Sequence, residues 1–137
     1  MSFNQALSVP LQSLFSKYAQ NDALEVISLA TTDGFPVQTL TTMTRSLEED
    51  SLSAAASTLH SVSNAVAQQI LGKNFKVAFI EAEQGNVAFV DLDIDESNYV
   101  LVMSANESLN IASLRLLITR LATEIEQLSP QTVVASA

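Results

Sequence analysis

Apolar residues at helical spacing mark residues 7–18 as an amphipathic α-helix. The positions that repeat every three or four residues are Leu7, Leu11, Leu14, Phe15 and Tyr18. Residues at this spacing share one face of a helix. Two further stretches have helical character, one from Ser46 to Leu71 and one over residues 108–128. The pattern therefore predicts three helices.

Two short apolar runs, Leu24–Thr31 and Phe35–Leu40, flank the dipeptide Asp33-Gly34. Asp-Gly between apolar runs favours a tight hairpin turn, because such turns need positive φ, which glycine adopts without strain. We therefore expect two antiparallel strands joined at this point. Val26 and Ile27 are adjacent and both apolar, which suggests that the first strand is covered on both faces.

Three more strand-like runs follow the second helix, with only short links between them. They are Phe75–Glu81, Asn86–Leu92 and Tyr99–Met103. Short links favour an antiparallel meander, because a parallel connection needs a long crossover. The predicted fold is of the α/β (α+β) class, a single five-stranded antiparallel sheet with helices on both faces, in the order α-β-β-α-β-β-β-α. We expect one domain over residues 1–128 and a flexible C-terminal tail over 129–137, which contains the helix-stopping Pro130.

The second helix has two different faces. At about 100° per residue one side carries the larger apolar residues and is expected to pack on the sheet: Leu52, Ala55, Leu59, Val62, Val66 and Ile70. The opposite side carries small or uncharged residues: Ala54, Thr58, Ser61, Ala65 and Gln68. A solvated helix face normally carries Lys and Glu. We therefore interpret this second side as the surface for a second copy of the chain, against the simpler interpretation of an Ala/Ser-rich exposed face.

The strand Phe75–Glu81 supports the same interpretation. Phe75, Val77 and Phe79 alternate with residues that are also largely apolar, so neither face of the strand is clearly polar. It begins the meander, so we expect it at an edge of the sheet, where an exposed apolar strand is a liability unless it is paired. Pairing with the same strand of a second copy would cover that edge.

These segments resemble the roadblock family, which is named for dynein light chains and includes bacterial regulators of small polarity GTPases. The resemblance rests on the hairpin EVISLATTDGFPVQTL, the helix SLSAAASTLHSVSNAVAQQILG and the strands KVAFIEAEQGNVAFVDL and YVLVMSA. It implies a homodimer or heterodimer in which the strand after the long helix pairs across a two-fold axis. It also implies that the face carrying the long helices docks a Ras-like GTPase, or that the protein is a scaffold subunit. The serine-rich long helix and the acidic segment 91–96 depart from the usual pattern.

Charge and composition exclude several other classes. The chain has 15 acidic and 6 basic residues, a net charge of −9. This disfavours nucleic acid, whose affinity depends on Lys and Arg, and anionic membrane surfaces. The chain has no cysteine, which excludes disulfides and thiolate chemistry. It has no apolar run of the length that a membrane span needs and no export signal, so we expect a cytoplasmic protein without membrane insertion.

The sequence offers little catalytic chemistry, so we predict no catalytic, cofactor-binding or metal-binding residues. Asp91, Asp93 and Asp95 imitate the start of a calcium loop, but the required glycine and the final glutamate are absent. His60 is the only histidine, and we expect a partly exposed helical residue rather than a metal ligand or catalytic base. The glycines form no phosphate-binding loop. Arg45 is the one candidate for an arginine finger acting on a GTPase.

Two functions of different classes remain. The first is a non-enzymatic dimeric adaptor or regulator of a Ras-like small GTPase, as the family resemblance implies. The alternative is a small acidic dimeric secretion chaperone that binds an extended client segment, although its usual element order differs. A profilin-like or sensor-like ligand domain is a third possibility, but it needs a pocket with convergent polar groups that the sequence does not indicate.

Overall fold

The computed structural model describes residues 7–43 and 47–128 and contains one five-stranded sheet with three helices. In chain order the elements are α1 (Ser8–Tyr18), β1 (Leu24–Thr31), β2 (Pro36–Thr41), α2 (Glu49–Leu71), β3 (Val77–Ala82), β4 (Gly85–Ile94), β5 (Ser97–Asn106) and α3 (Ile111–Glu126). The strands lie in the order β2-β1-β5-β4-β3, and every neighbouring pair is antiparallel. The predicted element order and antiparallel sheet are confirmed.

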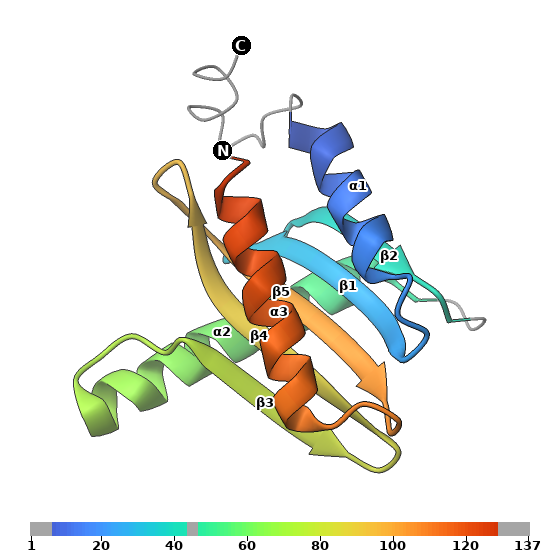
Figure 1. The fold of residues 1–137 in the computed structure, drawn as a ribbon. Helices are drawn as coiled ribbons and strands as arrows, with labels where there is room; N and C mark the ends of the chain where they lie inside the picture. Colours follow the sequence, from blue (N-terminus) through green and yellow to red (C-terminus); the bar gives the residue numbers. More distant parts are fainter. Residues whose placement is uncertain (1–6, 44–46, 129–137) are drawn as a thin grey trace.

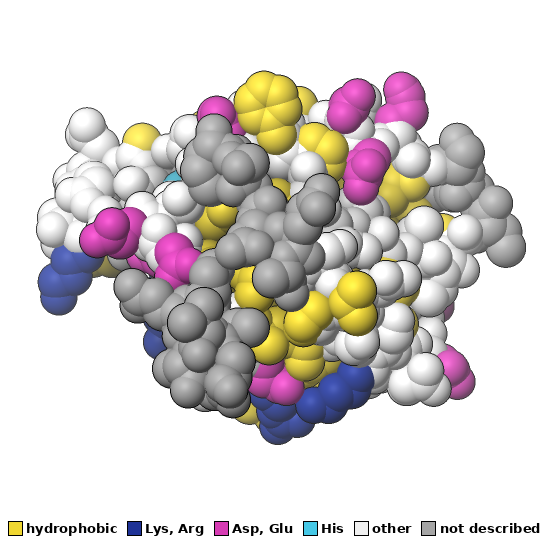
Figure 2. Space-filling view, turned by 90° about the horizontal axis from the view of Figure 1, so that it is seen from above, with side chains coloured by type: hydrophobic (Ala, Val, Ile, Leu, Met, Phe, Trp, Pro, Cys, Tyr) yellow, Lys and Arg dark blue, Asp and Glu magenta, His cyan; other side chains and the backbone are white. Residues whose placement is uncertain are grey.

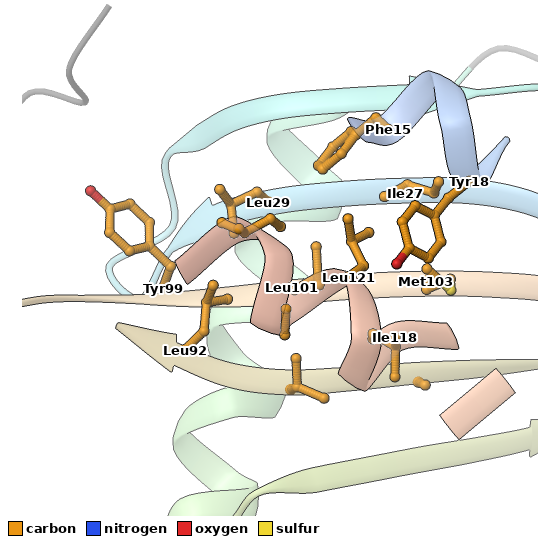
Figure 3. Packing of buried hydrophobic residues seen from close by; sticks show 14 of the residues in the cluster. Phe15, Tyr18, Ile27, Leu29, Leu92, Tyr99, Leu101, Met103, Ile118 and Leu121 are labelled. Atoms are coloured by element: carbon orange, nitrogen blue, oxygen red, sulfur yellow. The ribbon is translucent and has the colours of Figure 1, made fainter. Parts of the chain in front are cut away.

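The two faces of the sheet are covered very differently. Helices α1 and α3 lie on one face, and α2 lies alone on the other (Figure 1). The face under α1 and α3 holds the main core, where large side chains such as Phe15, Leu101 and Ile118 meet (Figure 3). The face under α2 holds a small cluster of buried residues: Ala30, Ala56, Phe89, Val100 and Val102. Val26 and Ile27 are both buried, as expected for a strand covered on both faces.

The connection between β1 and β2 differs from the expected tight turn. Only Gly34 has positive φ, at +100°, and the residues between the strands are 32–35. The N–H of Thr31 donates to the carbonyl of Phe35 at 2.9 Å, and the Thr31 hydroxyl accepts from the Phe35 N–H at 2.9 Å. The Thr31 side chain thus stabilises a loop over residues 32–35. This loop is longer than the two-residue primed turn typical of tight hairpins.

The helix ends also differ in part from the sequence prediction. Helix α2 begins at Glu49, and Ser46 lies outside the described residues. It ends as predicted at Gly72, whose φ of +66° is the left-handed conformation typical of a glycine after a helix. Helix α3 begins at Ile111 rather than at Ser108, because the Asn110 side chain accepts a hydrogen bond from the Ser113 N–H at 2.8 Å and caps it there.

A polar contact joins α1 to α3 at the edge of the main core. The Tyr18 hydroxyl donates to the Glu124 carboxylate, and Lys17 Nζ lies 3.1 Å from the same carboxylate. The hydrogen bond from Tyr18 lowers the pKa of Glu124, and Lys17 adds to that effect. Burial and the bond to Glu124 together raise the pKa of Tyr18. The contact therefore favours an ionised Glu124 and a neutral Tyr18.

Replacing Glu124 by Gln should lower the free energy of unfolding by about 1 kcal/mol at pH 7, because the charged acceptor of Tyr18 is lost. The pKa of Glu124 is lowered in the folded state, so its stabilising effect is present above the ordinary value of 4.5 and is lost as pH falls below it. In urea unfolding, the difference in free energy of unfolding between wild type and Glu124→Gln should therefore be smaller at pH 3 than at pH 7. Glu107→Gln, at an exposed residue, removes the same charge and should change stability little; equal losses in both variants would contradict the prediction.

Candidate functional site

Helix α2 packs on the sheet with a narrower face than predicted. Ser53, Ala56 and His60 are its buried residues, and Leu52 and Leu59 are half-buried as expected. The prediction that Ala55, Val62, Val66 and Ile70 also pack on the sheet is wrong, because all four are exposed. A helix of 23 residues is about 35 Å long, and its C-terminal half extends past the edge of the sheet (Figure 1).

The result is an apolar groove between the C-terminal half of α2 and β3. Its volume is about 670 Å³. Val62, Val66 and Ile70 line it from the helix with exposed fractions of 54%, 51% and 74%. Phe75 and Ala78 line it from the other side. Contiguous exposed apolar surface of this kind marks interaction sites in soluble proteins.

Strand β3 lies at the edge of the sheet, as predicted. The Asp91 N–H donates to the Lys76 carbonyl at 3.4 Å, so the backbone groups of Lys76 face β4. Backbone groups alternate between the two sides of a strand, and those of Val77, Phe79 and Glu81 therefore point away from β4. No strand within residues 7–43 and 47–128 pairs with this outer side.

The predicted interface residues fall on two surfaces. Five of them form an exposed row on α2: Ala54, Thr58, Ser61, Ala65 and Gln68. Phe75 is half-buried and packs against the small cluster under α2, whereas Val77 and Phe79 pack against the main core on the other face. The structure therefore brings Phe75 close to the α2 surface, whereas Val77 and Phe79 pack against the main core and also line the groove at the sheet edge.

Sequence reasoning missed the apolar part of this surface. Val62, Val66, Ile70, Leu71 and Ile80 are large and exposed, and the helical periodicity assigned the first three to the core. A signal was present in the length of α2, because its 23 residues span about 35 Å, whereas the 6 residues of the edge strand β3 span about 20 Å.

His60 is buried, which corrects the expectation of a partly exposed histidine. Its Nε2 lies 2.7 Å from Asp91 Oδ1, which also accepts from the Asn98 side-chain amide at 2.7 Å. The His60 ring packs edge-on against Phe75 with ring centres 5.1 Å apart. The Phe75 N–H in turn donates to Asn64 Oδ1 at 3.1 Å. Helix α2 thus holds both β4 and the segment that leads into β3.

The carboxylates of Asp91 and Asp93 in the acidic segment 91–96 take part in side-chain hydrogen bonds. Asp91 is engaged by His60 and Asn98, and the Asn98 amide also donates to Asp93 at 2.8 Å. Among the described residues no three acidic or histidine side chains are grouped so as to hold a metal ion. Arg45 lies outside the described residues, so its suggested role as an arginine finger stays a prediction.

Comparison with known families decides the classification. The model of the Roadblock/LC7 domain matches residues 11–105. The chain belongs to the Roadblock/LC7 family. Members of this family are generally regulators without enzymatic activity. Family membership therefore supports a role of this protein as a roadblock-type regulator.

Solved structures with the same fold include three structures of MglB. A structure titled MglB with tetrameric arrangement superposes with a TM-score of 0.82 at 12% identity and covers 96% of each chain. The gliding protein MglB from Thermus thermophilus gives 0.79 at 13% identity, again over 96% of each chain. MglB from Myxococcus xanthus gives 0.73 at 18% identity, over 86% of this chain and 93% of that one. These likenesses establish the fold. A search of curated proteins by sequence gave no significant match.

No helix in the described ranges has the length and apolar character that crossing a membrane would need.

Replacing His60 by Ala should lower the free energy of unfolding by about 1–3 kcal/mol, because Asp91 loses a buried hydrogen-bond partner and Phe75 loses a ring contact. Urea unfolding followed by circular dichroism measures this change. Thr58→Ala lies on the exposed side of the same helix and should change stability by less than about 0.5 kcal/mol. A small effect of His60→Ala would show that the contact is dispensable.

Proposed function

We propose that the protein is a non-enzymatic dimeric adaptor that binds a Ras-like small GTPase in the cytoplasm and modulates its nucleotide cycle or its location. Two features together support dimerisation: the apolar groove beside α2 and the unpaired outer side of β3. A second copy would cover both at once, because β3 and α2 lie next to each other at one edge of the molecule (Figure 1). Family membership supports the GTPase as partner, and the MglB structure titled as tetrameric supports self-association.

The backbone of β3 restricts how two copies can pair. In a two-fold antiparallel seam, the outward-facing residues Val77, Phe79 and Glu81 must hydrogen-bond among themselves. A seam centred on Phe79 would place Val77 opposite Glu81. A seam centred on Ala78 places Val77 opposite Phe79 and leaves only apolar side chains at the centre. We therefore propose Ala78 as the central residue, where its small side chain also lets the two α2 helices approach.

The seam can be tested with a single cysteine, because the chain has none of its own. In the proposed register the two Ala78 residues form a pair without mutual backbone hydrogen bonds, with Cα atoms about 4.5 Å apart, which a disulfide can span. Ala78→Cys should therefore form a covalent dimer under mild oxidation, measured on a non-reducing gel.

Two controls accompany this experiment. Leu116→Cys is 59% exposed on α3 and should cross-link only by random collision. Phe79→Cys should cross-link less than Ala78→Cys, and the reverse order would indicate a seam centred on Phe79. If wild type sedimented as a monomer at micromolar concentration, the dimer would be wrong.

The GTPase should bind with different affinity in its two nucleotide states, because a regulator can shift a conformational equilibrium only by its differential affinity. We expect at least a tenfold difference, about 1.4 kcal/mol, when GTP-loaded and GDP-loaded GTPases from the same cell are titrated separately. Equal affinities for the GTP-loaded and GDP-loaded forms would contradict regulation of the nucleotide cycle and would be consistent only with a scaffold role. No binding to any of them would overturn the proposal, and binding of an extended client segment would favour the chaperone alternative.

A further inference from the structure

The connection between β1 and β2 exposes an aromatic side chain beside a hollow. Phe35 is 65% exposed. It lines a hollow of about 550 Å³ together with Asp33 and two neighbouring threonines on one side, and with Ser97 and Asn98 of β5 on the other. This surface belongs to the β1–β2 side of the sheet, whereas the proposed dimer seam lies at β3, the opposite edge. A dimer through β3 therefore leaves it accessible.

The backbone that carries Phe35 is held in place before any partner binds. The Ser57 hydroxyl of α2 donates to the Thr32 carbonyl at 2.6 Å. Gly34 lies so close to α2 that a Cβ there would be 3.9 Å from the Ser57 Cβ and 4.0 Å from the Ala54 Cα. The two hydrogen bonds between Thr31 and Phe35 close the loop. Binding to a surface that is already ordered loses less conformational entropy.

Among the described residues, the charged side chains of the loops beside Phe35 are acidic. Asp33 is exposed in the same loop, and the exposed Asp95 and Glu96 form the β4–β5 turn directly before Ser97. The described basic residues lie on α1, on α3 and in the segment between α2 and β3: Lys17, Arg115, Arg120, Lys73 and Lys76. In Figure 2 the Lys and Arg side chains gather at the left and lower edges, whereas acidic side chains are spread over all sides of the view.

We propose that this surface docks a protein partner through an arginine or lysine that stands next to an apolar side chain. The cation would lie over the Phe35 ring, where the face of an aromatic ring attracts positive charge. Its aliphatic stem would pack on the same ring, while its charged end would be within reach of Asp33. Charge complementarity selects this chemistry, because an acidic partner segment would be repelled.

The surface is continuous with the exposed row on α2, because a Cβ at Gly34 would lie 4.0 Å from the Cα of Ala54, the first residue of that row. A partner seated on α2 would therefore meet Phe35 at its border. This inference deepens the proposed function, and it rests on that proposal only for the identity of the partner. The chemistry of the contact comes from Phe35 and the acidic side chains around the hollow.

The experiment is an NMR titration of the ¹⁵N-labelled full chain with a blocked hexapeptide, GLRLRG. We expect amide shift changes concentrated in residues 31–35 and 95–98. Phe35→Ala should weaken binding at least fivefold. Val9→Ala, at a residue 71% exposed on α1, should leave the affinity unchanged, and the acidic peptide GLELEG should cause no shift.

Shift changes spread over all acidic residues, equal affinity of wild type and Phe35→Ala, or no response to millimolar GLRLRG would each overturn this inference. The result is separable from the proposed function. The peptide titration does not require a dimer or a GTPase, so it can succeed where the cysteine cross-link or the GTPase titration fails, and it can fail where they succeed.

Discussion

A single α-helix cannot cover one face of a five-stranded sheet, and much of this structure follows from that mismatch. A helix with its side chains is about 10 Å wide, while five strands spaced about 4.8 Å apart are roughly twice as wide. Two helices, α1 and α3, cover the first face and bury a large core. The second face is covered by α2 alone, and the buried cluster beneath this helix is small. The apolar groove and the unpaired edge at β3 remain on that side.

The incompletely covered face is held by polar contacts rather than by a large apolar core. His60 and Asn64 of α2 hold Asp91 and the backbone of Phe75, and Ser57 holds the loop after β1. The contacts join α2 to β4, to the segment before β3 and to the loop after β1, respectively. Buried polar groups that are fully paired tend to define a single arrangement of neighbouring elements. Both the β3 edge and the Phe35 loop are thereby presented in defined positions.

The prediction from sequence was good for elements and poorer for surfaces. Antiparallel pairing within the hairpin and the meander, and the edge position of β3, could be anticipated, because short links leave few possible topologies. The pairing of β1 with β5, which completes the strand order, was not predicted. The exposed row on α2 was also anticipated, since its lack of charge is visible in the sequence. The apolar residues Val62, Val66 and Ile70 were misassigned to the core. Helical periodicity identifies which residues share a face, but it does not reveal where the underlying sheet ends.

The sequence by itself determined the order of helices and strands, the left-handed end of α2 at Gly72, the acidic charge and the family pattern. These are local properties or sums over the chain, so they need no knowledge of distant contacts. Only the tertiary structure decided that His60 is buried against Asp91, that α2 extends past the sheet, and that Phe35 stands exposed beside the β4–β5 turn. Each of these depends on which distant segments become neighbours, and a local pattern does not encode that information.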